Sequence, residues 1–405
     1  MPPIQNTRKG SEVQPTKRHV IPALTGIRAV AAGMVFFYHW FFSYVETLPR
    51  LIRAPFEVGY VGVPIFFALS GFLITIRYYE ALKQERIGYG RYLSKRFIRI
   101  YPLYFVILTL FVVAFQRPES MVPKDARSFF ATYTLTQALF PSLLLIGTTT
   151  GWTLTVEGMY YLLAPGLMKW LHKEQRLRAL LLRAAVLSLA AAGLGVGMAR
   201  LPLAEMMPDT LFGAPDTYIM HYTIFGHLAD FLVGMVGGIL YLRRDELPWL
   251  GRYARGLAWL NTFGMYAMVV ALDMIDAEAG SPLNRTVAFL VALFSASLIL
   301  SLSLDNGRRT LLGRGLGSRV MVYLGAISYA LYLIQLTEPC QWLYWIFLGE
   351  TAGVENRIWQ AILLYVLATL LAALMYELIE RPAHRQLTRW LNKVRVRQTA
   401  VSVRG

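Results

Sequence analysis

The stretch Ile21–Val45, IPALTGIRAVAAGMVFFYHWFFSYV, is long and apolar enough to cross a membrane as one helix, yet it contains Arg28 and His39. Burying an ionisable side chain in lipid is costly, and such residues usually face a cavity that serves chemistry or transport. The two are eleven residues apart, which on a helix is about three turns and about 16 Å of rise along one face. One helix face therefore presents a permanent cation at one depth and a titratable imidazole at another.

The rest of the chain is apolar in the same way. Of its 405 residues, 56% are hydrophobic and 16% are charged. Apolar runs of about 20 residues recur, so we predict an all-α membrane protein, a polytopic bundle of about ten transmembrane helices. Cys340 is the only cysteine, which excludes an intramolecular disulfide. The predicted spans are 21–43, 60–76, 100–115, 152–171, 180–199, 224–242, 257–275, 286–304, 320–337 and 358–380.

The net charge of +16 comes largely from Lys and Arg in alternate segments between these spans. With the N-terminus inside, these segments all face the cytoplasm, as the positive-inside rule requires. We therefore predict basic cytoplasmic tails at 1–20 and 383–405 around a membrane domain at 21–382. The expected location is the plasma membrane of a bacterium, its inner membrane. This topology accounts for the basic residues by contact with the lipid bilayer, without a nucleic-acid partner.

The longest predicted outer loop, Gln116–Gly151, contains a moderately apolar piece from Tyr133 to Ile146. This piece is short and is interrupted by Pro141, so we expect it to lie at the membrane interface or to fold into the bundle. An extra crossing here would also invert every later loop and destroy the charge alternation.

The second span carries Gly62, Pro64 and Gly71, an unusual number of small and kinking residues. They permit the close approach of another helix or a kink that opens a cavity. Ser70 lies among them and is a candidate nucleophile. Because it lacks the G-x-S-x-G motif and a local base, packing or a hydrogen bond within the helix is the simpler interpretation.

Three cations, Lys95, Arg96 and Arg99, lie just before the third span. The topology brings them to the depth of Arg28, and several convergent cations suit recognition of a polyphosphate. Anchoring at the membrane surface is the alternative and is the favoured interpretation for Lys95. Arg99 follows Arg96 by three residues, on a neighbouring helix face.

The first turns of the fourth span contain Glu157, followed by Tyr160 and Tyr161 at the helical i+3 and i+4 positions. An acid near the outer boundary suits orienting a histidine or binding sugar hydroxyls. An interfacial acid within an aromatic belt is the alternative.

Four residues in later spans join Ser70 and Tyr161 in a second tier of candidates. Tyr332 lies in the ninth predicted span, and Glu380 lies at the inner end of the last one, where it is expected to pair with Arg381 or the Arg96 and Arg99 cluster. His227 and Asp230 form a polar pair in the sixth span, but their spacing does not match the H-x-x-x-D pattern of soluble acyltransferases.

Taken together, these segments resemble the acyltransferase 3 family of integral membrane O-acyltransferases. The resemblance covers nearly the whole membrane domain. Each motif alone is weak, but six in family order are specific. They are Leu24–His39, Gly62–Ile74, Arg96–Pro102, Trp152–Tyr161, Ser328–Leu333 and Glu380–Pro382.

The resemblance implies an enzyme that takes an acyl group, usually acetyl, from cytoplasmic acyl-coenzyme A and places it on a hydroxyl of a carbohydrate or related acceptor. It implies that Arg28 and His39 are essential. Acetyl-coenzyme A is then a donor substrate, and neither a permanently bound cofactor nor a metal site is expected. The chain departs from the commoner family pattern at Thr25 and Pro64, each often Asp, and at Gln335, often His, which argues against a catalytic role at that last position.

The positions along the first span lead to a mechanistic hypothesis. Arg28, Arg96 and Arg99 hold the coenzyme A phosphates, and the pantetheine arm reaches toward His39. Neutral His39 acts as general base on the acceptor hydroxyl, while Glu157 orients its imidazole or stabilises the imidazolium. An acyl-histidine intermediate is an open alternative.

Two other classes of protein compete with this interpretation. A proton-coupled transporter or exporter also uses buried His, Glu and Arg, but the chain lacks the paired halves of many transporters. A structural or regulatory membrane scaffold is the other alternative. It requires that Arg28 and His39 have only structural hydrogen bonds and take no part in catalysis or transport. The acceptor stays open among a polysaccharide, a lipid-linked sugar, a lipooligosaccharide and a macrolide.

Overall fold

The computed structural model contains helices joined by turns and no strand in the ranges it describes, and this confirms the predicted all-α class. A helix satisfies its backbone hydrogen bonds internally, as a lipid environment demands. The predicted N-terminal tail, residues 1–20, lies outside the described part of the chain. The described residues are 21–41, 48–110, 122–172, 176–201, 206–207, 209–212, 214–275, 280–305, 310–347 and 354–402.

Each of the ten predicted apolar segments overlaps one long helix. These helices are α1 (Pro22–Phe41), α3 (Gly62–Lys83), α4 (Tyr89–Ile107), α6 (Gly151–His172), α7 (Leu177–Arg200), α9 (Ile224–Leu242), α10 (Pro248–Ile275), α11 (Pro282–Leu304), α13 (Arg319–Ile334) and α15 (Val354–Met375). Within the described ranges, six helices are long and apolar enough to cross a membrane, or seven if the sharply bent pair α13 and α14 (Glu338–Phe347) forms one span. The chain is thus a multi-pass membrane protein, and the count of about ten spans stays a prediction.

Helix α4 begins well before the apolar segment predicted as the third span, whose start is at residue 100. Helix α4 begins at Tyr89, and its polar first half packs against α16 (Arg381–Ser402), where Arg91 Nη2 donates to Asn392 Oδ1 at 2.8 Å. Hydropathy alone cannot detect a helical half that is stabilised by such polar contacts. Arg96 and Arg99 lie on this helix, three residues apart, as predicted.

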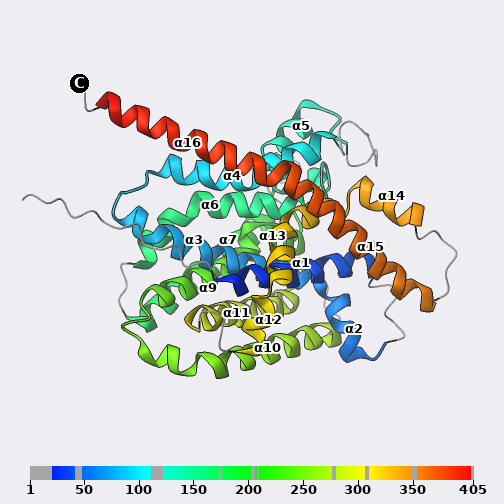
Figure 1. Ribbon diagram of the computed structural model, residues 1–405, viewed down its shortest axis with the longest axis horizontal. Helices are drawn as coiled ribbons and strands as arrows, with labels where there is room; N and C mark the ends of the chain where they lie inside the picture. Colours follow the sequence, from blue (N-terminus) through cyan, green and yellow to red (C-terminus); the bar gives the residue numbers. More distant parts are fainter. Residues whose placement is uncertain are drawn as a thin grey trace, which may run out of the picture.

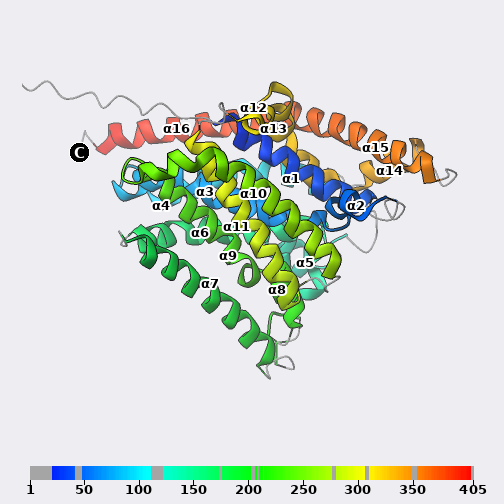
Figure 2. The same cartoon turned by 90° about the horizontal axis from the view of Figure 1, so that it is seen from below.

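The long helices lie side by side along the long axis of the molecule (Figure 1). Helices α3, α9 and α11 are mostly buried, whereas most of α7 and α10 is exposed, and α7 stands at one edge in the view from below (Figure 2). The most extensive packing joins α3 to α9, α10 to α11 and α1 to α13. Helix α1 therefore lies against the buried core, where its polar side chains meet other helices.

Glycines allow α3 and α9 to pack this closely. A Cβ atom on Gly234 of α9 would lie 1.9 Å from the carbonyl oxygen of Ala68, and one on Gly71 of α3 would lie 2.2 Å from that of Phe231. Both obstacles are backbone atoms, which cannot move aside without separating the helices. The predicted packing role of the small residues is confirmed at these positions.

We expect Gly234→Ala to destabilise the protein by about 1–3 kcal/mol, because the added methyl forces α3 and α9 apart. Thermal unfolding in detergent measures this loss. Gly256→Ala in the exposed half of α10 is the control, since its Cβ meets nothing within 4 Å. Equal thermal midpoints for the Gly234→Ala and Gly256→Ala variants would contradict the close packing of α3 against α9.

The segment around the predicted outer loop folds against the bundle and does not form a crossing helix. It contains α5 (Ala126–Tyr133) and two single turns, Gln137–Leu139 and Pro141–Leu143. The Gln137 side chain lies directly against Gly151 at the start of α6. The prediction that this piece folds into the bundle is confirmed for the described residues.

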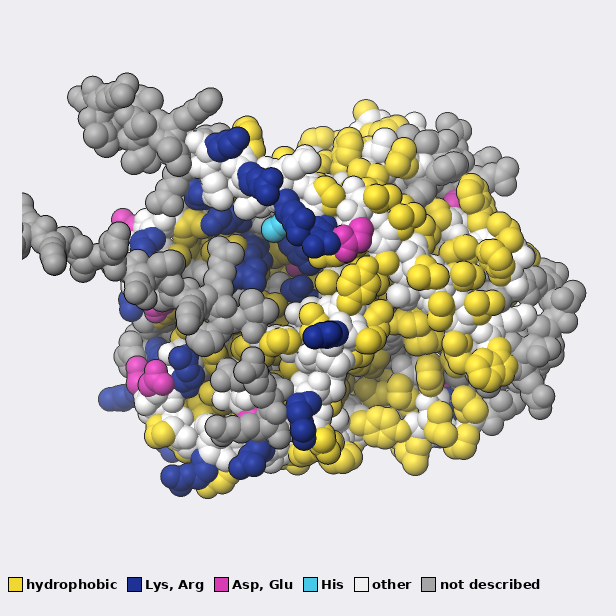
Figure 3. All heavy atoms as spheres, in the orientation of Figure 1, with side chains coloured by type: hydrophobic (Ala, Val, Ile, Leu, Met, Phe, Trp, Pro, Cys, Tyr) yellow, Lys and Arg dark blue, Asp and Glu magenta, His cyan; other side chains and the backbone are white. Residues whose placement is uncertain are grey.

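Helix α15 continues through a π-helical turn, Tyr376–Glu380, into α16. The predicted C-terminal tail is therefore helical to Ser402 and extends to the end of the molecule where Lys and Arg gather (Figures 1 and 3). A π-turn in an α-helix often marks a functional position. Here it carries Glu380 at its last residue.

Candidate active site

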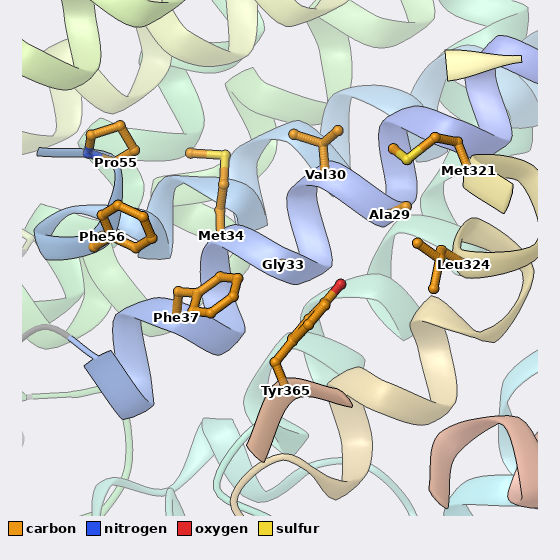
Figure 4. Close-up of a pocket in the computed structure, with 10 residues that line it drawn as sticks. All are labelled: Ala29, Val30, Gly33, Met34, Phe37, Pro55, Phe56, Met321, Leu324 and Tyr365. Atoms are coloured by element: carbon orange, nitrogen blue, oxygen red, sulfur yellow. The ribbon is translucent and has the colours of Figure 1, made fainter. Parts of the chain in front are cut away.

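Arg28 points from α1 into the bundle, whereas the opposite face of α1 lines an apolar pocket. Arg28 interacts electrostatically with Arg77 of α3, Arg99 of α4 and Glu157 of α6. The pocket, about 260 Å³, contains no ionisable group except the Tyr365 phenol (Figure 4), so we do not assign the chemistry to it. Its lining comes from α1, α2 (Arg50–Glu57), α13 and α15: Ala29, Val30, Gly33, Met34, Phe37, Pro55, Phe56, Met321, Leu324 and Tyr365.

Glu157 connects four of the predicted site residues. Its Oε1 accepts a short hydrogen bond from the hydroxyl of Tyr161 and a longer one, 3.5 Å, from Ser70 Oγ. Its charge also acts on Arg28 and on the buried phenol of Tyr332. Ser70 thus has a carboxylate partner from another helix, which the sequence interpretation of a local packing role did not include.

Arg96 lies among aromatic rings beside this carboxylate. Its Nη2 donates to the Tyr78 hydroxyl at 2.6 Å, and its guanidinium stands 4.6 Å from the centre of the Tyr78 ring and 5.8 Å from that of Tyr161. Tyr161 therefore joins Arg96 to Glu157. A cation over aromatic faces is stabilised away from water.

Arg99 pairs with Glu380 across the bundle. Its Nη1 lies 2.5 Å from Glu380 Oε1, and the Glu380 side chain is only 3% exposed. The expected pairing of Glu380 with the Arg96 and Arg99 cluster is confirmed for Arg99. Glu377, one turn earlier, pairs with Arg381 at 2.5 Å.

The Arg99–Glu380 pair borders a cavity of about 320 Å³. Its lining also includes Tyr376, Arg381, His384 and Arg385, so basic side chains dominate it. On the face in view, Lys and Arg gather at this end of the molecule, while apolar side chains cover the other end (Figure 3). A cavity with this lining suits an anionic ligand.

His39 lies at the other end of α1, in aromatic surroundings. Its ring centre is 5.0 Å from that of Tyr38, and the next residue, Trp40, donates from Nε1 to the backbone oxygen of Gln335 at 2.8 Å. The Gln335 side chain is fully buried, and both of its polar atoms lack a partner among the described residues. Gln335 is thus a neighbour of the histidine segment even though it is not a histidine itself.

Helix α9 holds a second polar network. His227 Nδ1 lies 2.8 Å from Asp230 Oδ2, which also accepts from Arg285 Nη2 at 3.0 Å. All three side chains are buried. The predicted pair is therefore a triad, whose third member comes from α11.

The structure brings most of the predicted residues into one cluster, but not all of them. Arg28, Arg99 and Glu157 converge, together with the partners described above. Glu157 contacts Ser70 and Tyr161, and no contact between Glu157 and His39 is found in the described ranges. The structure pairs Glu157 with Tyr161 and Ser70 and places its charge near Arg28, so its role in orienting His39 stays a prediction.

Several site residues escaped the sequence analysis. The sequence analysis did not select four of them, because in the local sequence each is an ordinary basic residue at the end of an apolar run. These are Arg77, His384, Arg385 and Arg285. One signal was available: His384 follows Glu380 by four residues, which places both on one helix face. No group of three or more potential metal ligands occurs in the part of the chain that the structure describes.

Comparison with known proteins adds independent information. The sequence profile of a family described as an acyltransferase domain, Acyl_transf_3, matches residues 21–377. The chain is 23% identical over 389 residues to the peptidoglycan O-acetyltransferase OatA of Listeria monocytogenes, covering 91% of this chain but 56% of that protein. It is 26% identical over 391 residues to the acyltransferase MdmB of Streptomyces mycarofaciens, covering 91% and 93%.

A third relative, the O-acetyltransferase OatA of Staphylococcus aureus, is 21% identical over 388 residues, with 90% of this chain and 57% of that protein covered. The chain thus spans just over half the length of the two OatA proteins and nearly the whole of MdmB. No solved structure matches it.

Proposed function

Because the chain belongs to the acyltransferase 3 family, we propose that it is an integral membrane O-acyltransferase. It moves an acyl group, most simply acetyl, from cytoplasmic acyl-coenzyme A to a hydroxyl of a carbohydrate or glycolipid. One observation carries this proposal: Arg28, Arg99, Glu157 and Glu380 gather beside a basic cavity, with Glu380 buried and the other three partly buried, and His39 lies farther along α1.

The cavity is the proposed site of the donor phosphates. Arg99, Arg381, His384 and Arg385 line it, and guanidinium groups recognise phosphate oxygens in a bidentate manner. In the structure the Arg99 guanidinium donates a hydrogen bond to the Glu380 carboxylate. A phosphate of the donor would therefore compete with Glu380 for Arg99 when it binds. We place this basic end in the cytoplasm, on the positive-inside rule, and the whole protein in the bacterial inner membrane.

Arg28 and Glu157 lie between the cavity and His39. This position suits the passage of the pantetheine arm that carries the acyl group. Glu157 and Glu380 offset the charge of the arginines around them, which reduces the cost of holding those cations in the bundle. Tyr161 and Ser70 provide hydroxyl groups beside Glu157. We therefore propose that Glu157 also balances the charge of Arg28.

The transfer step requires a base at the acceptor hydroxyl. The imidazole of His39 removes the hydroxyl proton while the oxygen attacks the thioester carbonyl, the carbon–sulfur bond breaks, and the coenzyme A thiolate leaves and takes up a proton. The alternative route acylates His39 first and then transfers the acyl group to the hydroxyl. Label retained on the protein when acceptor is omitted distinguishes the second route.

The full chain in liposomes tests the proposal. We expect radiolabel from acetyl-coenzyme A to appear in an extract of envelope glycans and lipids only when the protein is present. Mass spectrometry of the extract then locates the added acetyl group and identifies the acceptor. Absence of transfer, combined with substrate uptake that needs no acyl-coenzyme A, would instead support the proton-coupled transporter.

A further inference from the structure

Five aromatic rings from four elements adjoin one another at the His39 end of α1. Tyr38 belongs to α1, Tyr60 to the single turn Gly59–Val61, Trp152 to α6, and His221 and Tyr222 to α8 (Asp216–Tyr222). Ring centres are 5.4 Å apart for Tyr38 and Tyr60, 6.1 Å for Tyr60 and His221, 5.9 Å for Trp152 and His221, and 5.3 Å for Trp152 and Tyr222. Tyr38 is itself next to His39, at 5.0 Å.

This ring cluster differs from an interfacial aromatic belt. Belt residues point outward to lipid headgroups, whereas these five are each partly buried and contact rings from neighbouring helices. They also present polar atoms. The Tyr60 hydroxyl accepts from Asn284 Nδ2 at 2.7 Å, which leaves its own proton to donate, and the buried Nδ1 of His221 has no partner among the described residues.

The buried triad behind the ring cluster holds α8 in place. His227 Nε2 lies 2.8 Å from the backbone oxygen of His221, and a carbonyl oxygen can only accept, so this nitrogen carries a proton. Its Nδ1 lies 2.8 Å from Asp230 Oδ2, so both ring nitrogens of His227 have polar partners. Arg285 binds the same carboxylate and also donates to the Gly226 oxygen at 2.7 Å. These contacts join α8, α9 and α11 next to the ring cluster.

We infer that the ring cluster is the acceptor subsite and that it binds a neutral sugar ring with one hydroxyl directed at His39. The inference rests on the proposed function. Aromatic faces pack against the C–H face of a sugar, while polar atoms at their edges bind its hydroxyls. None of the five residues is a Lys, Arg, Asp or Glu, and the nearby Arg285 is engaged with Asp230. A neutral saccharide therefore fits this surface better than an anionic headgroup.

Trp152 is the best residue for a test, because it touches three other rings: those of His221, Tyr222 and His227. The probes are triacetylchitotriose and maltotriose, and saturation-transfer NMR measures their binding to the full-length protein in detergent. We expect Trp152→Leu to weaken binding of the preferred saccharide about tenfold. Trp152→Phe keeps a ring and retains most of the binding, while acetyl-coenzyme A binding is unchanged in both.

Trp259→Leu, on the exposed face of α10, is the matched control and binds like the unmodified protein. Tyr222→Leu provides a second variant should Trp152→Leu fail to fold, and it is expected to weaken binding likewise. Saccharide binding that depends on Trp152 without any acetyl transfer would support the subsite and reject the proposed function. Acetyl transfer with an acceptor KM indifferent to Trp152 and Tyr222 would overturn the subsite and leave the function standing.

Discussion

Replacing His39 by alanine is expected to lower kcat for acetyl transfer by about 10²- to 10⁴-fold, the usual contribution of a positioned general base. The coenzyme A phosphates are proposed to bind about three turns away, so the Kd of acetyl-coenzyme A should not change. Initial rates in liposomes and calorimetric titration measure the two quantities separately. His39→Gln, which keeps a polar side chain but offers no base, should be equally impaired.

Val30→Ala is the control on the same helix, because Val30 lines the apolar pocket on the opposite face of α1 (Figure 4). It should transfer acetyl groups at the normal rate. A His39→Ala protein with full transfer would remove His39 from the mechanism, and the base would have to be sought elsewhere in the bundle.

Removing Arg99 should affect stability and donor binding together. Arg99→Ala leaves the buried carboxylate of Glu380 without its cation, and breaking such a pair typically costs about 3–5 kcal/mol. Because Arg99 is itself 31% exposed, solvent reduces that cost, and we expect a loss nearer the lower end. The KM for acetyl-coenzyme A should rise at least about tenfold, since one charge-assisted phosphate contact is lost.

A double variant separates the two effects. Arg99→Gln with Glu380→Gln removes both charges and leaves amides able to hydrogen bond, so the thermal midpoint should recover while donor binding stays weak. Arg200→Ala is the control for stability, because its 3.1 Å pair with Asp216 is 74% and 42% exposed and is worth at most about 1 kcal/mol. Undiminished acetyl-coenzyme A binding by the double variant would exclude Arg99 from the donor site.

The predicted helices agree with the structure wherever hydrophobicity alone decides the outcome. The apolar runs that became α9 and α11 were located to within a few residues, since a lipid-buried backbone has to be helical. The start of α4 was missed because its polar half is stabilised by α16, a contact between residues about 300 positions apart. A helix boundary that depends on tertiary contacts cannot be predicted from the hydropathy of the local sequence.

In the candidate site, too, the local sequence predicts the residues but not their tertiary contacts. Ser70, Arg96 and Tyr161 could be selected from residue type and helical position, but their actual partners could not. The link from Ser70 to Glu157 joins α3 to α6, and its formation depends on how far each helix slides and rotates against the other. Glycine contacts such as Gly234 on Ala68 fix the closest approach of α3 to α9, and no ionisable residue takes part in that contact.

The sequence by itself determined that this chain is a multi-pass helical membrane protein, and that Arg28 and His39 share one face of its first helix. Both follow from local rules, namely the cost of exposing a backbone to lipid and the period of the α-helix. Only the tertiary structure decided which charged residues of other helices gather near Arg28, namely Glu157 and the Arg99–Glu380 pair. The physical reason is that helix packing depends on shape complementarity between distant segments, which no single segment encodes.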